Sequence, residues 1–220
     1  DIRATLNYGA LLLLMSDGDK DKLTEAVKYI KKAADEGFYE AISRYGVVRY
    51  IGIGVPIDKE EACRYIKIAA NRRNKYLSFM YGVILRDGDG EPFDKVSASK
   101  YLKFAADSGV KEACHEYAWM LYSGDGIPQD KKEASLYYKK GADMGDLDSM
   151  FLYGKMLHLG DGIPKNMDEA KRYYYEAAEN GHDKAQYAYG KLCMENGSST
   201  EGNIYLIGAA DKGIVEAMLL

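Results

Sequence analysis

Several kinds of segment are missing from this 220-residue sequence. It contains no run of 18 apolar residues, so no part of it is expected to insert into a bilayer. It also lacks a long basic run, and its formal net charge is −4. Because nucleic-acid binding requires concentrated positive charge, we expect no nucleic-acid partner.

Cysteine is scarce as well. The three cysteines are Cys63, Cys114 and Cys193. An odd number at unrelated positions does not make a disulfide framework, so each is interpreted as a small buried hydrophobic residue. This usage fits a reducing compartment, and we predict a cytoplasmic location.

The motifs of catalysis and metal binding are absent too. His115, His158 and His182 have no His or Cys partner at metal-ligand spacing on the same helix. The segment 17–21 begins like a calcium loop, but lysine occupies its sixth and twelfth positions, where glycine and glutamate are needed. The sequence therefore predicts a non-enzymatic protein without a cofactor or bound metal.

What the sequence does contain is a repeat. A Tyr-Gly or Tyr-Ala pair recurs every 36 or 37 residues, starting at Tyr8, Tyr45, Tyr81, Tyr117, Tyr153 and Tyr189. The four prolines recur every 36 residues, at Pro56, Pro92, Pro128 and Pro164. Self-similarity at this period indicates supersecondary units that bury their apolar faces by stacking on one another.

We predict one domain over residues 1–220, made of stacked repeats. The repeats span residues 4–40, 41–76, 77–112, 113–148, 149–184 and a shorter 185–216, and residues 217–220 open a further one. Since that last repeat is cut inside a helix, we expect the chain to be part of a longer protein.

The second repeat shows how one unit is built. Apolar spacing predicts a helix from Ala41 to Ile51, followed by a glycine-containing turn. Asp58 then caps a second helix from about Lys59 to Asn71, and Glu61 makes a capping-box-like pair with it. The other five repeats close with glycine here, and because Arg73 replaces it, we expect a different turn.

These motifs resemble the Sel1-like repeat, a relative of the tetratricopeptide repeat. The second repeat reads Ala41-x-x-x-Tyr45-Gly46, then Gly52-x-Gly54-Val55-Pro56-x-Asp58, then Ala62-x-x-Tyr65-x-x-x-Ala69-Ala70. The resemblance covers the whole chain. It implies an all-α, right-handed α/α superhelix, a solenoid of about six 36-residue helix–loop–helix repeats. It also implies an adaptor or scaffold that binds a partner protein, peptide or helix.

The resemblance further implies that the first helices line the concave surface. On these helices, three positions spaced i, i+4 and i+7 differ strongly in character among the repeats and form one stripe. We predict the partner-binding groove there, with its aromatic and cationic side chains suited to an acidic peptide with apolar anchors. The predicted site residues are Arg86, His115, Trp119, Tyr122, Lys155 and His158.

Two alternatives to this function stay open. In the first, the chain is an adaptor of a membrane ubiquitin ligase in endoplasmic-reticulum quality control, which would place it in the lumen. In the second, the chain recruits substrate for an enzyme domain elsewhere in a longer protein. Stacking of the solenoid ends into a homodimer is a further expectation.

Overall fold

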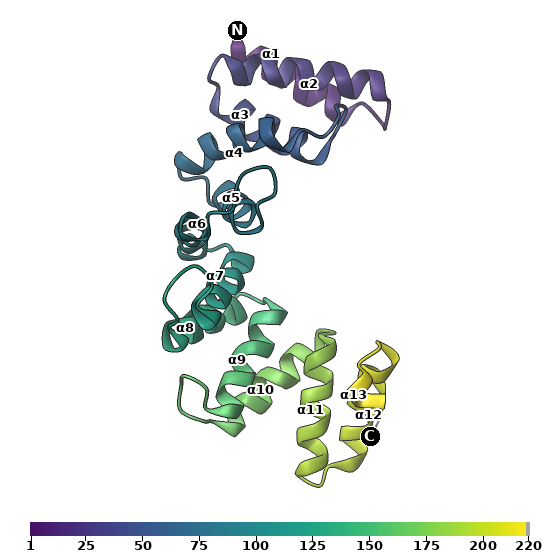
Figure 1. The fold of residues 1–220 in the computed structure, drawn as a ribbon. Helices are drawn as coiled ribbons and strands as arrows, with labels where there is room; N and C mark the ends of the chain where they lie inside the picture. The colour runs from purple at the N-terminus through teal and green to yellow at the C-terminus, as the bar shows by residue number, and fades with distance from the viewer. Residues whose placement is uncertain (219–220) are drawn as a thin grey trace. The chain divides into compact units, whose positions relative to one another are not determined.

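The computed structural model describes residues 1–218, and every regular element within them is an α-helix. Consecutive helices pack as antiparallel pairs, and within residues 1–110 and again within residues 111–218 each pair packs on the next, so the chain is an all-α solenoid (Figure 1). The expected opening of a seventh repeat, 217–220, lies partly outside the described residues.

The chain forms two compact units, residues 1–110 and 111–220. The helices of the first unit are α1 Ile2–Leu14, α2 Lys20–Asp35, α3 Tyr39–Ile51, α4 Lys59–Asn71, α5 Lys75–Asp87 and α6 Lys95–Asp107. Those of the second are α7 Lys111–Ser123, α8 Lys131–Asp143, α9 Leu147–Leu159, α10 Met167–Glu179, α11 Asp183–Glu195, α12 Ser199–Asp211 and α13 Val215–Met218. The second helix predicted in the second repeat is confirmed as α4. The first helix, α3, begins two residues earlier than predicted, at Tyr39.

The recurring Tyr-Gly pair joins the two helices of a repeat. Its tyrosine meets a second-helix tyrosine edge to face in every repeat, with ring centroids 4.7–5.0 Å apart. Such aromatic pairs contribute about 0.5–1.5 kcal/mol beyond the area they bury. The glycine lets the helices approach: a Cβ on Gly46 would lie 2.9 Å from Cγ1 and 3.1 Å from the backbone nitrogen of Ile66.

The predicted helix cap is confirmed only in part. The Asp58 carboxylate accepts the Glu61 backbone N–H at 2.9 Å, as expected. However, the Glu61 carboxylate accepts hydrogen bonds from Tyr45 and Arg49 instead of returning to Asp58. The Asp58 N–H donates instead to the Arg49 carbonyl, so this loop is tied to the first helix of its repeat.

The expectation of a different turn at Arg73 is wrong. Arg73 takes φ +64°, the same left-handed conformation that glycine takes at this place in other repeats, for example Gly109 at φ +83°. The hydrogen bonds that close the helix are also the same, from Arg73 to Ala70 and from Asn74 to Ala69. The Arg73 guanidinium lies 4.6 Å from the centroid of the Phe104 ring, a cation–π contact that glycine cannot make.

Candidate functional site

Two neighbouring pockets lie on the first-helix face of the second unit. The larger has a volume of about 590 Å³ and is formed mainly by α9 and α11; we call it the lysine pocket. The smaller, about 160 Å³, lies between α7, α8 and α9; we call it the tryptophan pocket. Lys155 and Leu159 line both pockets, so the two form one continuous surface.

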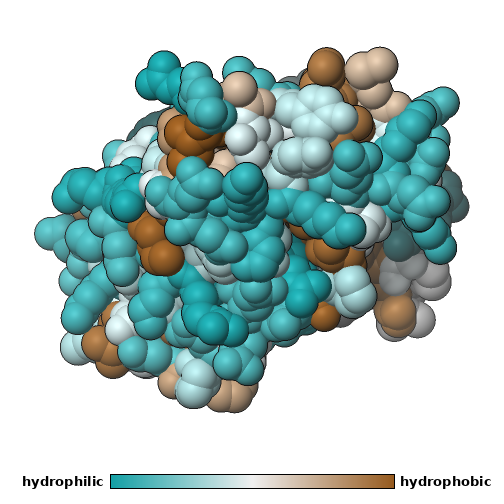
Figure 2. All heavy atoms as spheres, turned by 90° about the horizontal axis from the view of Figure 1, so that it is seen from above, coloured by the Kyte–Doolittle hydropathy of each residue, from teal (hydrophilic) through white to brown (hydrophobic). Residues whose placement is uncertain are grey.

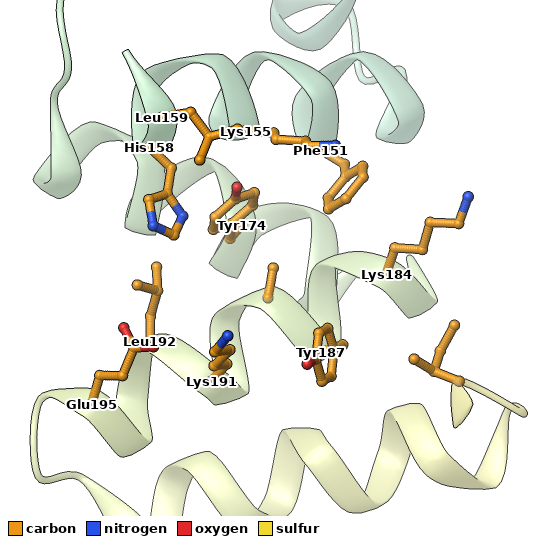
Figure 3. Close-up of a pocket in the computed structure, with 12 residues that line it drawn as sticks. Phe151, Lys155, His158, Leu159, Tyr174, Lys184, Tyr187, Lys191, Leu192 and Glu195 are labelled. Atoms are coloured by element: carbon orange, nitrogen blue, oxygen red, sulfur yellow. The ribbon is translucent and has the colours of Figure 1, made fainter. Parts of the chain in front are cut away.

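The lysine pocket has an aromatic lining. Side chains of α9 and α11 face each other across it, and the Tyr174 ring of α10 lies between His158 and Phe151 (Figure 3). The Phe151 ring centroid is 5.8 Å from that of Tyr174, and the His158 centroid is 6.1 Å from it. Tyr174 is buried, which raises the pKa of its phenol, whereas Phe151 and Tyr187 are partly exposed to a ligand.

Positive charge surrounds this aromatic lining. Lys155, Lys184 and Lys191 are exposed lining residues, and Glu195 is the acidic one. Three lysines and one glutamate give the pocket a formal charge of +2 with histidine neutral, in a chain of net charge −4. Within the part of the chain that the structure describes, none of the three lysines forms a salt bridge. Lys155 interacts electrostatically with Asp161, and Lys184 and Lys191 extend the positive charge along α11.

The tryptophan pocket is lined mainly by aromatic and apolar side chains, with Lys155 and Asp161 beside them. Trp119 is 45% exposed and stacks on Tyr122, with an interplanar angle of 24°. Leu152 and Met156 of α9 form the facing wall. Tyr138 of α8 also lines this pocket and is only 1% exposed.

A loop carboxylate fixes Tyr122 in place. The Tyr122 hydroxyl donates to Asp161 at 2.6 Å, and the Lys131 amino group donates to the same carboxylate at 2.8 Å. Both contacts cross from one repeat to the next. The same arrangement occurs in the first unit, where Tyr50 and Lys59 bind Asp89. Tyr122 therefore offers a ligand its ring rather than its hydroxyl.

Because of this network, the folding stability of the protein is expected to depend on pH. The hydrogen bonds from Lys131 and Tyr122 lower the pKa of Asp161 below its unfolded value of about 3.9. A lowered folded pKa gives stabilisation that is present above pH ~4 and is lost as the pH falls through the folded pKa. We therefore expect Asp161→Asn to be less stable than the wild type at pH 7, with a difference that shrinks toward pH 3. Thermal unfolding followed by circular dichroism measures this, and a difference that stays constant from pH 7 to pH 3 contradicts it.

Five of the six predicted site residues lie in the second unit. Trp119, Tyr122, Lys155 and His158 line the two pockets. His115 lies on α7, half-buried near Tyr138, with its Nδ1 atom 4.0 Å from an Asp146 carboxylate oxygen.

Arg86 lies in the first unit, on α5, where its guanidinium pairs with the neighbouring Asp87 carboxylate at 2.7 Å. Sequence reasoning did not assign Lys184 and Glu195, which stand at other positions of the helix. They could have been found by extending the stripe on α11 by one turn at each end. Tyr138 was missed because it lies on a second helix, where aromatic residues usually belong to the core.

The rest of the surface has fewer features that suggest a binding site. The face seen in Figure 2 is mostly hydrophilic, and its hydrophobic residues occur in separate small patches. In residues 1–218, no group of three or more His, Cys, Asp or Glu side chains is arranged to hold a metal ion. The described residues also include no helix that is long and apolar enough to cross a membrane.

Six segments match the sequence profile of the Sel1 repeat: residues 2–38, 40–74, 78–110, 111–146, 147–182 and 183–206. The chain belongs to the Sel1 repeat family. The first five matched segments follow the predicted repeats with offsets of a few residues, and the sixth ends at residue 206, ten residues before the predicted end at 216. Proteins of this family generally act as protein–protein interaction modules.

Solved structures agree with the assignment. The chain is similar to c5321, a protective antigen of uropathogenic Escherichia coli strains with an SLR fold, with a TM-score of 0.88 and 24% identity. That match covers 97% of this chain and 47% of the other, so the chain spans about half the length of c5321.

A Sel1 repeat protein from Oxalobacter formigenes has a TM-score of 0.78 and 25% identity, over 96% of this chain and 88% of the other. Comparison with curated proteins finds no match. The similarity to c5321 supports the fold alone.

Proposed function

We propose that this Sel1 repeat protein is a scaffold that binds an acidic segment of a partner protein on the first-helix face of its second unit. The observation that carries the proposal is the lysine pocket, where lysines without a salt bridge surround two partly exposed aromatic rings. Aromatic side chains supply most of the binding energy at protein interfaces, and complementary charge selects the partner and speeds encounter. The pocket opens onto a helical face, which suits an extended or helical segment more than a small metabolite.

The same reasoning favours protein over nucleic acid as the partner, because the chain has a net charge of −4 and the pocket's formal charge of +2 is only a small local excess. No catalytic step enters the proposal. The three cysteines are buried and free, which favours the cytoplasm over the endoplasmic-reticulum lumen. Self-association through the chain ends also stays a proposal, supported by the exposure of Leu14 and Met15 at the end of α1.

A random decapeptide library displayed on phage tests the main proposal. Selection on the wild-type protein is expected to enrich peptides that combine Asp or Glu with bulky apolar residues. The Lys155→Glu, Lys191→Glu double variant is expected to lose this enrichment, because it reverses two charges of the pocket.

The matched control changes two exposed lysines outside both pockets, Lys132→Glu and Lys165→Glu, for the same change in net charge. It is expected to select the same peptides as the wild type. If the wild type enriches no acidic motif, or if both double variants behave alike, binding at the lysine pocket is refuted.

A further inference from the structure

The tryptophan pocket contains a buried polar group without a partner. Tyr138 lines the pocket, and its hydroxyl forms no hydrogen bond within residues 1–218. Burial of the residue raises the pKa of this phenol, so it stays a neutral hydroxyl that both donates and accepts. Leaving a buried polar group unpaired costs about 1–3 kcal/mol, so the hydroxyl needs a compensating role.

Packing does not require a hydroxyl at this place. The equivalent positions of the third and second repeats, 36 and 72 residues earlier, hold Leu102 and Ile66, both 0% exposed. An aliphatic side chain therefore fills this core position in the first unit. Tyrosine takes the position in the fourth and fifth repeats, as Tyr138 and Tyr174, and each of these tyrosines lines one of the two pockets.

The size and lining of the tryptophan pocket restrict what it can hold. Its volume of about 160 Å³ is close to the roughly 150 Å³ of an apolar protein cavity that holds a benzene molecule. Trp119, Leu152 and Met156 favour an apolar body, and the Tyr138 hydroxyl, with Lys155 and Asp161 also in the lining, favours a polar tip. Tyrosine is the amphipathic side chain with a ring of this size and a single hydroxyl at its end.

We propose that the tryptophan pocket receives a tyrosine side chain of the acidic segment, with the tyrosine hydroxyl hydrogen-bonded to that of Tyr138. This inference rests on the proposed function, since the same segment would place its carboxylates by the lysine pocket. Because Lys155 and Leu159 line both pockets, a tyrosine next to acidic residues can reach both at once. The recognised element is then a tyrosine flanked by Asp or Glu.

Three peptides test this assignment. Each carries two glutamates on either side of a central residue, which is tyrosine, phenylalanine or alanine, and binding to the full chain is measured by fluorescence anisotropy. The wild type is expected to bind the tyrosine peptide about 5- to 20-fold more tightly than the phenylalanine peptide, because only tyrosine pairs the buried hydroxyl. Tyr138→Phe is expected to lose this preference while binding the phenylalanine peptide as before.

The outcomes separate the two proposals. Equal affinity of the wild type for all three peptides, with binding still abolished by Lys155→Glu and Lys191→Glu, overturns the tyrosine assignment and keeps the proposed function. A tyrosine preference that survives in Tyr138→Phe also overturns the assignment. Failure of every peptide to bind, together with an unenriched library, overturns both.

A stability measurement tests the same hydroxyl without any ligand. Tyr138→Phe is expected to unfold at the same temperature as the wild type or higher, because it removes an unpaired buried hydroxyl. The matched control Tyr122→Phe removes a hydroxyl that is bonded to Asp161, and it is expected to unfold at a lower temperature. A lower unfolding temperature for Tyr138→Phe would mean that the hydroxyl is already satisfied in the free protein, and would refute the assignment.

Discussion

Gly162→Ala is expected to lower the free energy of unfolding by about 2–5 kcal/mol. Gly162 takes φ +78°, where a residue with a Cβ pays about 1–2 kcal/mol. A Cβ added there would also lie 2.5 Å from the Cβ and 3.1 Å from the carbonyl carbon of Lys131. Neither atom can move without shifting α8, and such overpacking costs about 1–3 kcal/mol more.

Gly145→Ala provides the matched control for this prediction. Gly145 takes φ +82°, but a Cβ there would have no atom within 4 Å, so we expect a loss of only about 1–2 kcal/mol. Urea unfolding of both variants, followed by far-ultraviolet circular dichroism, gives the comparison. Equal losses would show that the loop shifts away from α8 at no cost and would contradict the close approach.

The loop that contains Gly162 also contacts residues of the tryptophan pocket. Asp161, the residue before Gly162, holds both Tyr122 and Lys131. Moving the loop away from α8 would lengthen these bonds and release the Tyr122 ring on which Trp119 stacks. The glycine that the sequence shows as a turn signal therefore also positions a wall of the tryptophan pocket.

The period and the local signals were enough to predict most of the fold. Residues at one repeat position meet the same neighbours in each repeat, so six copies of a motif reveal what a single copy would not. Helix ends are decided by short-range hydrogen bonds, which is why Asp58 and the residues Lys59–Asn71 could be assigned from the sequence.

Interactions between residues far apart in the sequence were harder to predict. The Glu61 carboxylate had two partners within reach, the Asp58 backbone and the side chains Tyr45 and Arg49, and only coordinates show that it binds the side chains. Arg73 adopts a conformation that intrinsic preference disfavours, and its cation–π contact with Phe104 accompanies it.

The candidate site shows the same limit. Four of the predicted residues lie on one pocketed surface, because helix geometry decides which side chains share a face, and their role in binding stays a prediction. The stripe could not show that the Tyr122 hydroxyl donates a hydrogen bond to Asp161. Nor could it show that the Tyr138 hydroxyl, on the neighbouring helix, has no hydrogen-bond partner. Both facts depend on the exact distance between packed helices.

The second large effect is expected when the charge of the lysine pocket is reversed by mutation. In the Lys155→Glu, Lys191→Glu variant, two attractions to an acidic peptide become two repulsions. Each exposed charge pair contributes about 0.2–1 kcal/mol, and a like-charge contact costs a similar amount. Two exchanges then amount to about 1–4 kcal/mol, and a middle value near 2 kcal/mol lowers affinity for the tyrosine peptide flanked by glutamate by about 30-fold.

A peptide with the same tyrosine flanked by lysine instead of glutamate reverses this result. The wild type should bind it weakly, because Lys155, Lys184 and Lys191 repel it. The double variant should bind it more tightly than the wild type does, since its pocket charge changes from +2 to −2 while Phe151, Tyr187 and the tryptophan pocket are unchanged.

Anisotropy titrations at low and physiological salt measure both peptides on both proteins, and the reversal of preference should weaken as salt screens the charges. If the double variant loses the acidic peptide without gaining the basic one, then the lysines act through their packing rather than their charge. In that case charge complementarity is not the basis of recognition.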